Sequence, residues 1–68
     1  MDKLKLEYYI KSKGYTAEEI SNVLGISKSA FYRKMNQTTE FTRNEIELLI
    51  KTLEIEDPVS IFFASEVS

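Results

Sequence analysis

The stretch of sequence that decides the fold is TAEEISNVLGISKSAFYRKMN, residues 16–36. Its first half carries four apolar side chains at helical spacing, which predicts a helix with one inward face. These residues are Ala17, Ile20, Val23 and Leu24. Gly25 follows, and we expect it to end the helix because glycine readily adopts the left-handed backbone conformation of a helix terminus.

A second helix begins after only three residues. Ser27 is a favourable N-cap for a helix over residues 28–36. Phe31 and Met35 lie four positions apart and mark the inward face of this helix. A short turn that begins with glycine allows two helices to cross at about 90–120°. Ser21 is small enough to permit the close approach that such a crossing requires. The stretch therefore predicts a helix-turn-helix.

Capping boxes mark two of the helix starts. Thr16 is followed three residues later by Glu19, and Thr42 by Glu45. In this motif the threonine side chain accepts a hydrogen bond from the glutamate amide, and the glutamate carboxylate accepts one from the threonine amide. We therefore expect helices to begin directly after Thr16 and Thr42.

The two ends of the chain each predict one more helix. Asp2 is a suitable cap for a helix from about residue 3 to 13, with Gly14 as its stop. Pro58 follows Asp57, which is typical of the first turn of a helix. Because no segment alternates with period two for long, we expect a single all-α domain of five helices over residues 1–68.

Composition narrows the function classes. The chain has 68 residues and contains neither Cys nor His. The chain therefore lacks thiolate and imidazole metal ligands, and it lacks the side chains that most often act as catalytic nucleophiles and general bases. We expect no enzyme activity, no cofactor and no metal site. No segment has the length of apolar sequence needed for a signal peptide or a membrane span, which favours a cytoplasmic protein without a membrane partner.

Charge is distributed unevenly along the chain. Residues 1–37 hold seven Lys/Arg and four Asp/Glu, whereas residues 38–68 hold two and seven. The net charge of −2 therefore combines a basic half of +3 with an acidic half of −5. This asymmetry predicts one basic working face on an otherwise acidic body. The acidic side chains, Glu45 among them, are expected to form a solvated surface.

The outward side of the helix 28–36 carries hydrogen-bonding side chains. Basic and hydroxyl side chains can bond the base edges of a major groove, and an aromatic ring can contact a thymine methyl group. The candidates for base contact are Lys28, Ser29, Tyr32 and Arg33. A solvated polar face is the alternative interpretation, and the glycine turn before the helix favours base contact.

Phosphate contacts are expected around this helix. They would come from the amide end of the preceding helix and from the loop that follows. The candidates are Thr16, Ala17, Lys34, Asn36, Gln37, Thr38, Thr39 and Arg43. For Lys34 we expect the methylene stem to cover Phe31 and the ammonium group to face the DNA backbone.

Residues 6–63 resemble the phage repressor and Cro (Xre-like) family. The resemblance is carried by GYTAEEIS at 14–21, by LGISKSAFYRKMN at 24–36, and by Phe41, Thr42, Glu45, Ile46 and Leu53. It implies a compact five-helix, lambda-repressor-like domain that binds double-stranded operator DNA, in most cases palindromic, as a homodimer and regulates transcription. The chain departs from the family at Ala17, where many members carry a Gln that contacts a phosphate.

The end of the chain suggests how a dimer would form. The segment after Pro58 is more apolar than a short terminal helix requires, and we expect one phenylalanine ring to close the core while the other joins a symmetric interface. The candidates for the dimer interface are Val59, Ile61, Phe62 and Phe63.

Two other functions fit the same pattern. The chain could be a protein-interaction module on a helix-turn-helix scaffold, such as an antirepressor or a modulator that binds another repressor protein. It could also be the DNA-binding part of a larger assembly that bends DNA with weak sequence preference.

Overall fold

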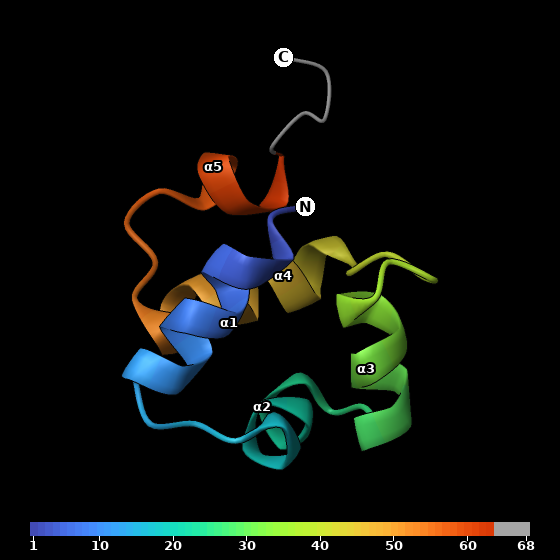
Figure 1. The fold of residues 1–68 in the computed structure, drawn as a ribbon. Helices are drawn as coiled ribbons and strands as arrows, with labels where there is room; N and C mark the ends of the chain where they lie inside the picture. Colours follow the sequence, from blue (N-terminus) through green and yellow to red (C-terminus); the bar gives the residue numbers. More distant parts are fainter. Residues whose placement is uncertain (64–68) are drawn as a thin grey trace.

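A computed structural model describes residues 1–63, and within them the chain forms five α-helices and no strand. The helices are α1 (Lys3–Ser12), α2 (Ala17–Leu24), α3 (Lys28–Met35), α4 (Arg43–Leu53) and α5 (Pro58–Phe62), shown in Figure 1. The prediction of an all-α chain is confirmed. None of these five helices is long and apolar enough to cross a membrane.

The predicted caps determine where the helices begin. The Thr16 hydroxyl oxygen accepts from the Glu19 amide at 3.1 Å, and the Glu19 carboxylate accepts from the Thr16 amide at 2.8 Å. Thr42 and Glu45 form the same pair of bonds at 3.2 and 2.8 Å. Each such cap stabilises a helix by about 1 kcal/mol relative to alanine. Single side-chain caps begin the other three helices, at Asp2, Ser27 and Asp57.

Four helices end in the same way, with one residue in the left-handed conformation. These residues are Gly14, Gly25, Gln37 and Glu54, with φ of +82°, +71°, +62° and +53°. In each case the amide of the next residue bonds the carbonyl five residues earlier, in the pairs Tyr15–Ile10, Ile26–Ser21, Thr38–Arg33 and Ile55–Ile50. Gly25 thus ends α2 as predicted. Gln37 and Glu54 carry a Cβ atom in this conformation, which costs about 1 kcal/mol at each position.

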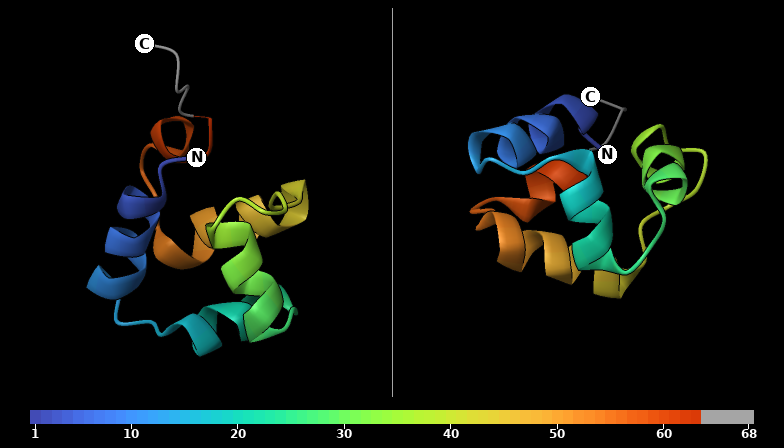
Figure 2. Two further views of the ribbon diagram at one scale, coloured as in Figure 1. Left: turned by 45° about the vertical axis from the view of Figure 1, so that its right-hand side comes forward. Right: turned by 90° about the horizontal axis from the view of Figure 1, so that it is seen from below.

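Every helix contributes to one core. The buried apolar side chains are Leu6, Ile10, Ile20, Leu24, Phe31, Met35, Leu49, Leu53, Ile55 and Ile61. In Figure 1, α4 lies behind α1, and α3 stands at the side of the molecule. Helix α2 packs against both α3 and α4, and α1 packs against α5. In the two further views of Figure 2, the ribbons of α3 and α1 are set apart from each other.

Two predicted positions differ in the structure. Val23 is 38% exposed. The inward face of α2 is formed by Ala17, Ile20, Ser21 and Leu24, and Val23 lies at the edge of this face. Ile61, predicted in a dimer interface, is 0% exposed within the single chain. Its side chain belongs to the core, and its carbonyl accepts from the Asp2 amide at 2.7 Å, so it is not available to a second copy.

Ser21 is a small residue on the buried face of α2. It is 2% exposed, and its hydroxyl donates to the Glu18 carbonyl at 2.7 Å, so its polar group is satisfied within the helix. The small side chain lets α2 pack against its neighbours.

We predict that Ser21→Leu lowers the free energy of unfolding by about 1–3 kcal/mol, because the added carbons overpack the core. Ser21→Ala is the matched control and should change it by less than about 1 kcal/mol, because it removes the hydroxyl and adds no volume. Urea denaturation followed by circular dichroism measures both. Equal stability of the two variants would contradict the close packing at this position.

Candidate nucleic-acid interface

The outward face of α3 carries the four predicted base-contacting residues. Phe31 and Met35 are buried on the opposite side of the helix at 2% and 4% exposure. Lys28, Ser29, Tyr32 and Arg33 are all exposed. Within residues 1–63, no hydrogen bond or ion pair engages these four side chains. Tyr32 is 48% exposed although it is aromatic.

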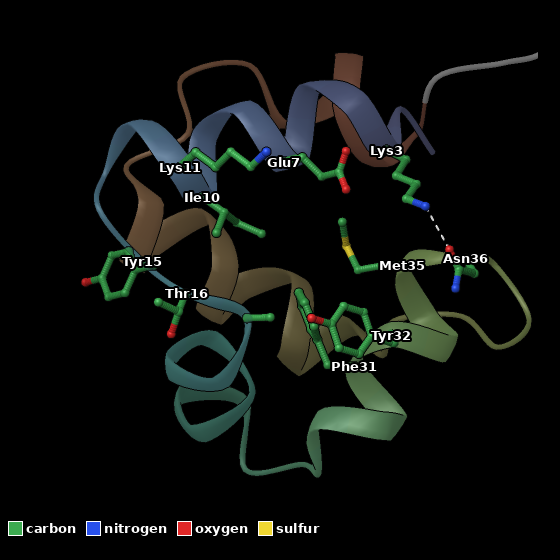
Figure 3. A pocket seen from close by; sticks show the side chains of 11 residues that line it. Lys3, Glu7, Ile10, Lys11, Tyr15, Thr16, Phe31, Tyr32, Met35 and Asn36 are labelled. Atoms are coloured by element: carbon green, nitrogen blue, oxygen red, sulfur yellow. Dashed lines mark hydrogen bonds between the residues drawn. The ribbon is translucent and has the colours of Figure 1, made fainter.

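A cleft of about 330 Å³ lies between α1 and α3. Its floor is apolar and is formed by Ile10, Phe31 and Met35, and Figure 3 shows Tyr32 at its edge on α3. Four of the predicted contact residues line this cleft together: Thr16, Ala17, Tyr32 and Asn36. The structure therefore brings the beginning of α2 and the last turn of α3 to one opening.

A contact between α1 and α3 bridges this cleft. The Lys3 ammonium group donates to Asn36 Oδ1 at 2.7 Å, and the bond is drawn in Figure 3. Lys3 was not among the site residues predicted from the sequence. Nothing in the local pattern connects two residues that lie 33 positions apart.

The other predicted phosphate contacts lie on a different side of α3. Gln37 and Thr39 line a second hollow between the loop after α3 and the end of α5. Thr38 is exposed in the same loop. The Arg43 side chain is 92% exposed, and its Nε lies 3.6 Å from a carboxylate oxygen of Glu47. The predicted phosphate set is thus divided between two sides of the helix.

Lys34 does not face outward as predicted. Its ammonium group lies 2.9 Å from Glu45 Oε1 and donates to the Glu40 carbonyl at 3.2 Å, and only 14% of its side chain is exposed. It also lies 6.0 Å from the centre of the Phe41 ring. These contacts direct the charge toward α4, which removes Lys34 from the set of phosphate contacts. Glu45, expected on a solvated surface, is only 8% exposed.

The pKa of Glu45 lies below its ordinary value of 4.5. Burial of the carboxylate raises the pKa, but the hydrogen bonds from Thr42 and the hydrogen bond and positive charge of Lys34 together outweigh that effect. The folded protein therefore favours the charged carboxylate more strongly than the unfolded chain does.

The end of the described chain presents one partly buried ring and one exposed ring. Phe62 is partly buried, and its ring centre lies 6.5 Å from that of Phe41 in an edge-to-face arrangement. Phe63 is 66% exposed and Val59 is 63% exposed. Of the predicted interface residues, Val59 and Phe63 are therefore the ones most available to another molecule.

Comparison of the chain with protein-family models, with curated proteins and with solved structures finds no match. Among residues 1–63, no group of three or more Asp or Glu side chains is arranged to hold a metal ion.

We predict that Glu45→Gln lowers the free energy of unfolding by about 1–3 kcal/mol at neutral pH, because it leaves the Lys34 charge without its partner. Since the pKa of Glu45 is lowered on folding, its contribution is present above the ordinary value of 4.5 and is lost as the pH falls through the folded value. Denaturant unfolding at a series of pH values should therefore show a weaker acid dependence in the variant than in the parent.

Glu47→Gln is the matched control on the same helix. Its carboxylate pairs with the exposed Arg43, so we expect a change within about 0.5 kcal/mol. Identical acid dependence in the parent and in Glu45→Gln would contradict the role given to the Lys34–Glu45 pair.

Proposed function

We propose that this protein binds double-stranded DNA in a sequence-specific manner and regulates transcription, with α3 in the major groove. The observation that carries the proposal is the exposed face of α3, on which four hydrogen-bonding side chains have no partner within residues 1–63. This face has an exposed tyrosine and two cations, and the segment 25–37 contains no acidic residue.

The chemistry of the face fits the edges of base pairs. Arg33 and Lys28 can donate to guanine O6 and N7, Ser29 can bond several base edges, and the Tyr32 ring can contact a thymine methyl group. Residues near the beginning of such a helix reach furthest into the groove. The rigid placement of α3 between α2 and the Lys34–Glu45 pair would hold these groups in a fixed register.

Phosphate contacts would flank α3. The beginning of α2 offers the Ala17 amide, the hydroxyl hydrogen of Thr16 and the positive end of a helix dipole, which favour an anion. The Thr16 amide itself donates to the Glu19 carboxylate. Gln37, Thr38, Thr39 and Arg43 would contact the backbone on the other side. In a helix-turn-helix these contacts set the position on DNA and carry no sequence information.

A dimer would place two α3 helices on one duplex. The apolar surface that Val59 and Phe63 leave exposed at the end of the described chain supports a symmetric interface there. Two half-sites would then lie about 34 Å apart, and the preferred sequence would be palindromic.

A protein-binding function is the second candidate, and a specific observation favours it. Leu4 and Tyr8, one turn apart on α1, are 77% and 69% exposed. This pair lies on a different helix from the proposed dimer surface, and it is apolar enough to contact a protein such as another repressor. DNA binding would require the exposed face of α3, whereas protein binding through Leu4 and Tyr8 would not.

We predict that selection from random duplexes at moderate salt returns one palindromic motif. Arg33→Ala should lose about 1–3 kcal/mol of discrimination at one base pair in each half-site, because a base-edge contact is removed. Lys51→Ala, which removes an exposed cation from α4, is the matched control and should return the parent motif. If the parent protein enriched no motif, sequence-specific DNA binding would be abandoned.

Arg43→Ala should act differently from Arg33→Ala. Loss of a phosphate contact weakens binding to all sequences alike and reduces the slope of log affinity against log salt by about 0.9 for each bound subunit. Fluorescence anisotropy titrations on the selected duplex and on a shuffled duplex measure both quantities. A change of preferred base in Arg43→Ala would show that it reads sequence.

We predict that Phe63→Ser shifts the protein from dimer to monomer, because it removes the most exposed ring from the proposed interface. Leu4→Ser is the control, since Leu4 is at least as exposed on α1. Sedimentation equilibrium measures the association constant of each. If Leu4→Ser alone produced monomers, the interface would be on α1 and not at the end of the chain.

A further inference from the structure

The hydrogen bond between Lys3 and Asn36 joins α1 to the last turn of the proposed reading helix. Lys3 is half-buried, Asn36 is exposed, and their contact distance is 2.7 Å. Asn36 caps the end of α3, and both side chains line the cleft that also contains Tyr32 and Thr16. The bond therefore shares the cleft with Tyr32, a proposed base contact, and with Thr16, a proposed phosphate contact.

The bond determines which way the Asn36 amide points. A lysine ammonium group has only donors, so it must face the amide oxygen. The Asn36 NH₂ group is consequently turned away from Lys3, as Figure 3 shows, and its two hydrogens are directed out of the contact. The Lys3 ammonium group has three hydrogens and donates one of them here, so two remain for another acceptor.

The charge of Lys3 also changes the electrostatics at this end of α3. The carboxyl end of a helix carries a partial negative charge of about −0.5, which repels a phosphate group. The nearby Arg33 extends from the outward face, and Lys34 is directed toward Glu45. Lys3, from a different helix, supplies a cation where the helix itself would oppose an anion.

We infer that Lys3 and Asn36 together form a binding site for a DNA phosphodiester group at the carboxyl end of α3, which makes α1 part of the nucleic-acid interface. The inference rests on the proposed DNA-binding function and adds a residue to it. In this arrangement Lys3 provides charge and orients the amide, and Asn36 donates to the same phosphate. The cleft then lies between this phosphate site and the one at the beginning of α2.

The chain offers a matched control for Lys3. Lys5 is on the same helix, and its ammonium group also donates to a side chain distant in sequence, the Ser60 hydroxyl, at 3.1 Å. Glutamine at either position removes one positive charge and weakens one contact between helices. Only Lys3 contacts α3, so a general effect of charge or stability would appear equally in both variants.

The experiment measures the affinity of the parent, Lys3→Gln, Lys5→Gln and Lys3→Arg for a mixed-sequence duplex of about 20 base pairs by fluorescence anisotropy. At about 3.4 Å per base pair this duplex exceeds the 33 Å length of the protein. Salt is varied from about 50 to 200 mM. Lys3→Gln should reduce the salt slope by about 0.9 for each bound subunit, which makes its loss of affinity about 3.5-fold greater per subunit at the low end of that range than at the high end.

Lys5→Gln should keep the parent slope, because Lys5 does not contact the end of α3. Lys3→Arg should also keep it, because arginine retains the positive charge. Asn36→Ala combined with Lys3→Gln should lose less affinity than the sum of the single losses, because the two residues serve one phosphate. Thermal unfolding by circular dichroism establishes that each variant is folded.

The outcomes separate the two proposals. If the parent binds and Lys3→Gln keeps its slope, or if Lys5→Gln loses the same slope, the phosphate site is overturned and the DNA-binding proposal stands. If the parent shows no affinity for the duplex even at the lowest salt, both proposals fail together.

Discussion

One carboxylate oxygen, on Glu45, ties the end of α3 to the beginning of α4. Glu45 Oε1 accepts from the Thr42 amide at 2.8 Å and from the Lys34 ammonium group at 2.9 Å. The first bond begins α4, and the second fixes the last turn of α3 against it. Lys34 also holds the Glu40 carbonyl, so the loop between the two helices is tied to the same point. Because α3 faces a cleft on its α1 side, its support comes from α2, from this pair and from the Lys3–Asn36 bond.

Local chemistry made most of the fold predictable. An N-terminal cap involves residues only three positions apart, so Thr16 with Glu19 and Thr42 with Glu45 could be recognised from the sequence alone. Gly25 could also be recognised as a helix stop, because the left-handed conformation it adopts is typical of glycine. Val23 was assigned to the core because it is apolar and lies at helical spacing from Ile20, but the buried face of α2 includes Ser21 instead.

The candidate site was less predictable because its geometry depends on distant residues. Lys34 pairs with a residue 11 positions away, and Lys3 bonds one 33 positions away. The helical periodicity of the sequence predicts neither contact. Gln37 and Glu54 were also missed as helix stops, since each uses the left-handed conformation without being glycine. The exposed face of α3 was predictable because the buried positions of one helix determine which positions remain outside.

The engaged lysines change how the charge asymmetry should be understood. The segment 25–37 holds three cations, but Lys34 neutralises an acid inside the fold. Fewer cations are then free to attract DNA than the sequence count suggests. With a net charge of −2, a single chain of this kind gains little affinity from non-specific attraction, which increases the importance of base contacts and of a second copy.

The repeated helix ends also bear on the route by which the chain folds. Each N-terminal cap and each left-handed terminus is closed by bonds between residues no more than five positions apart, so these bonds can form without contact between helices. A chain whose structure is specified so locally has little loop-closure entropy to overcome. Helical domains with short-range contacts fold in about microseconds to milliseconds.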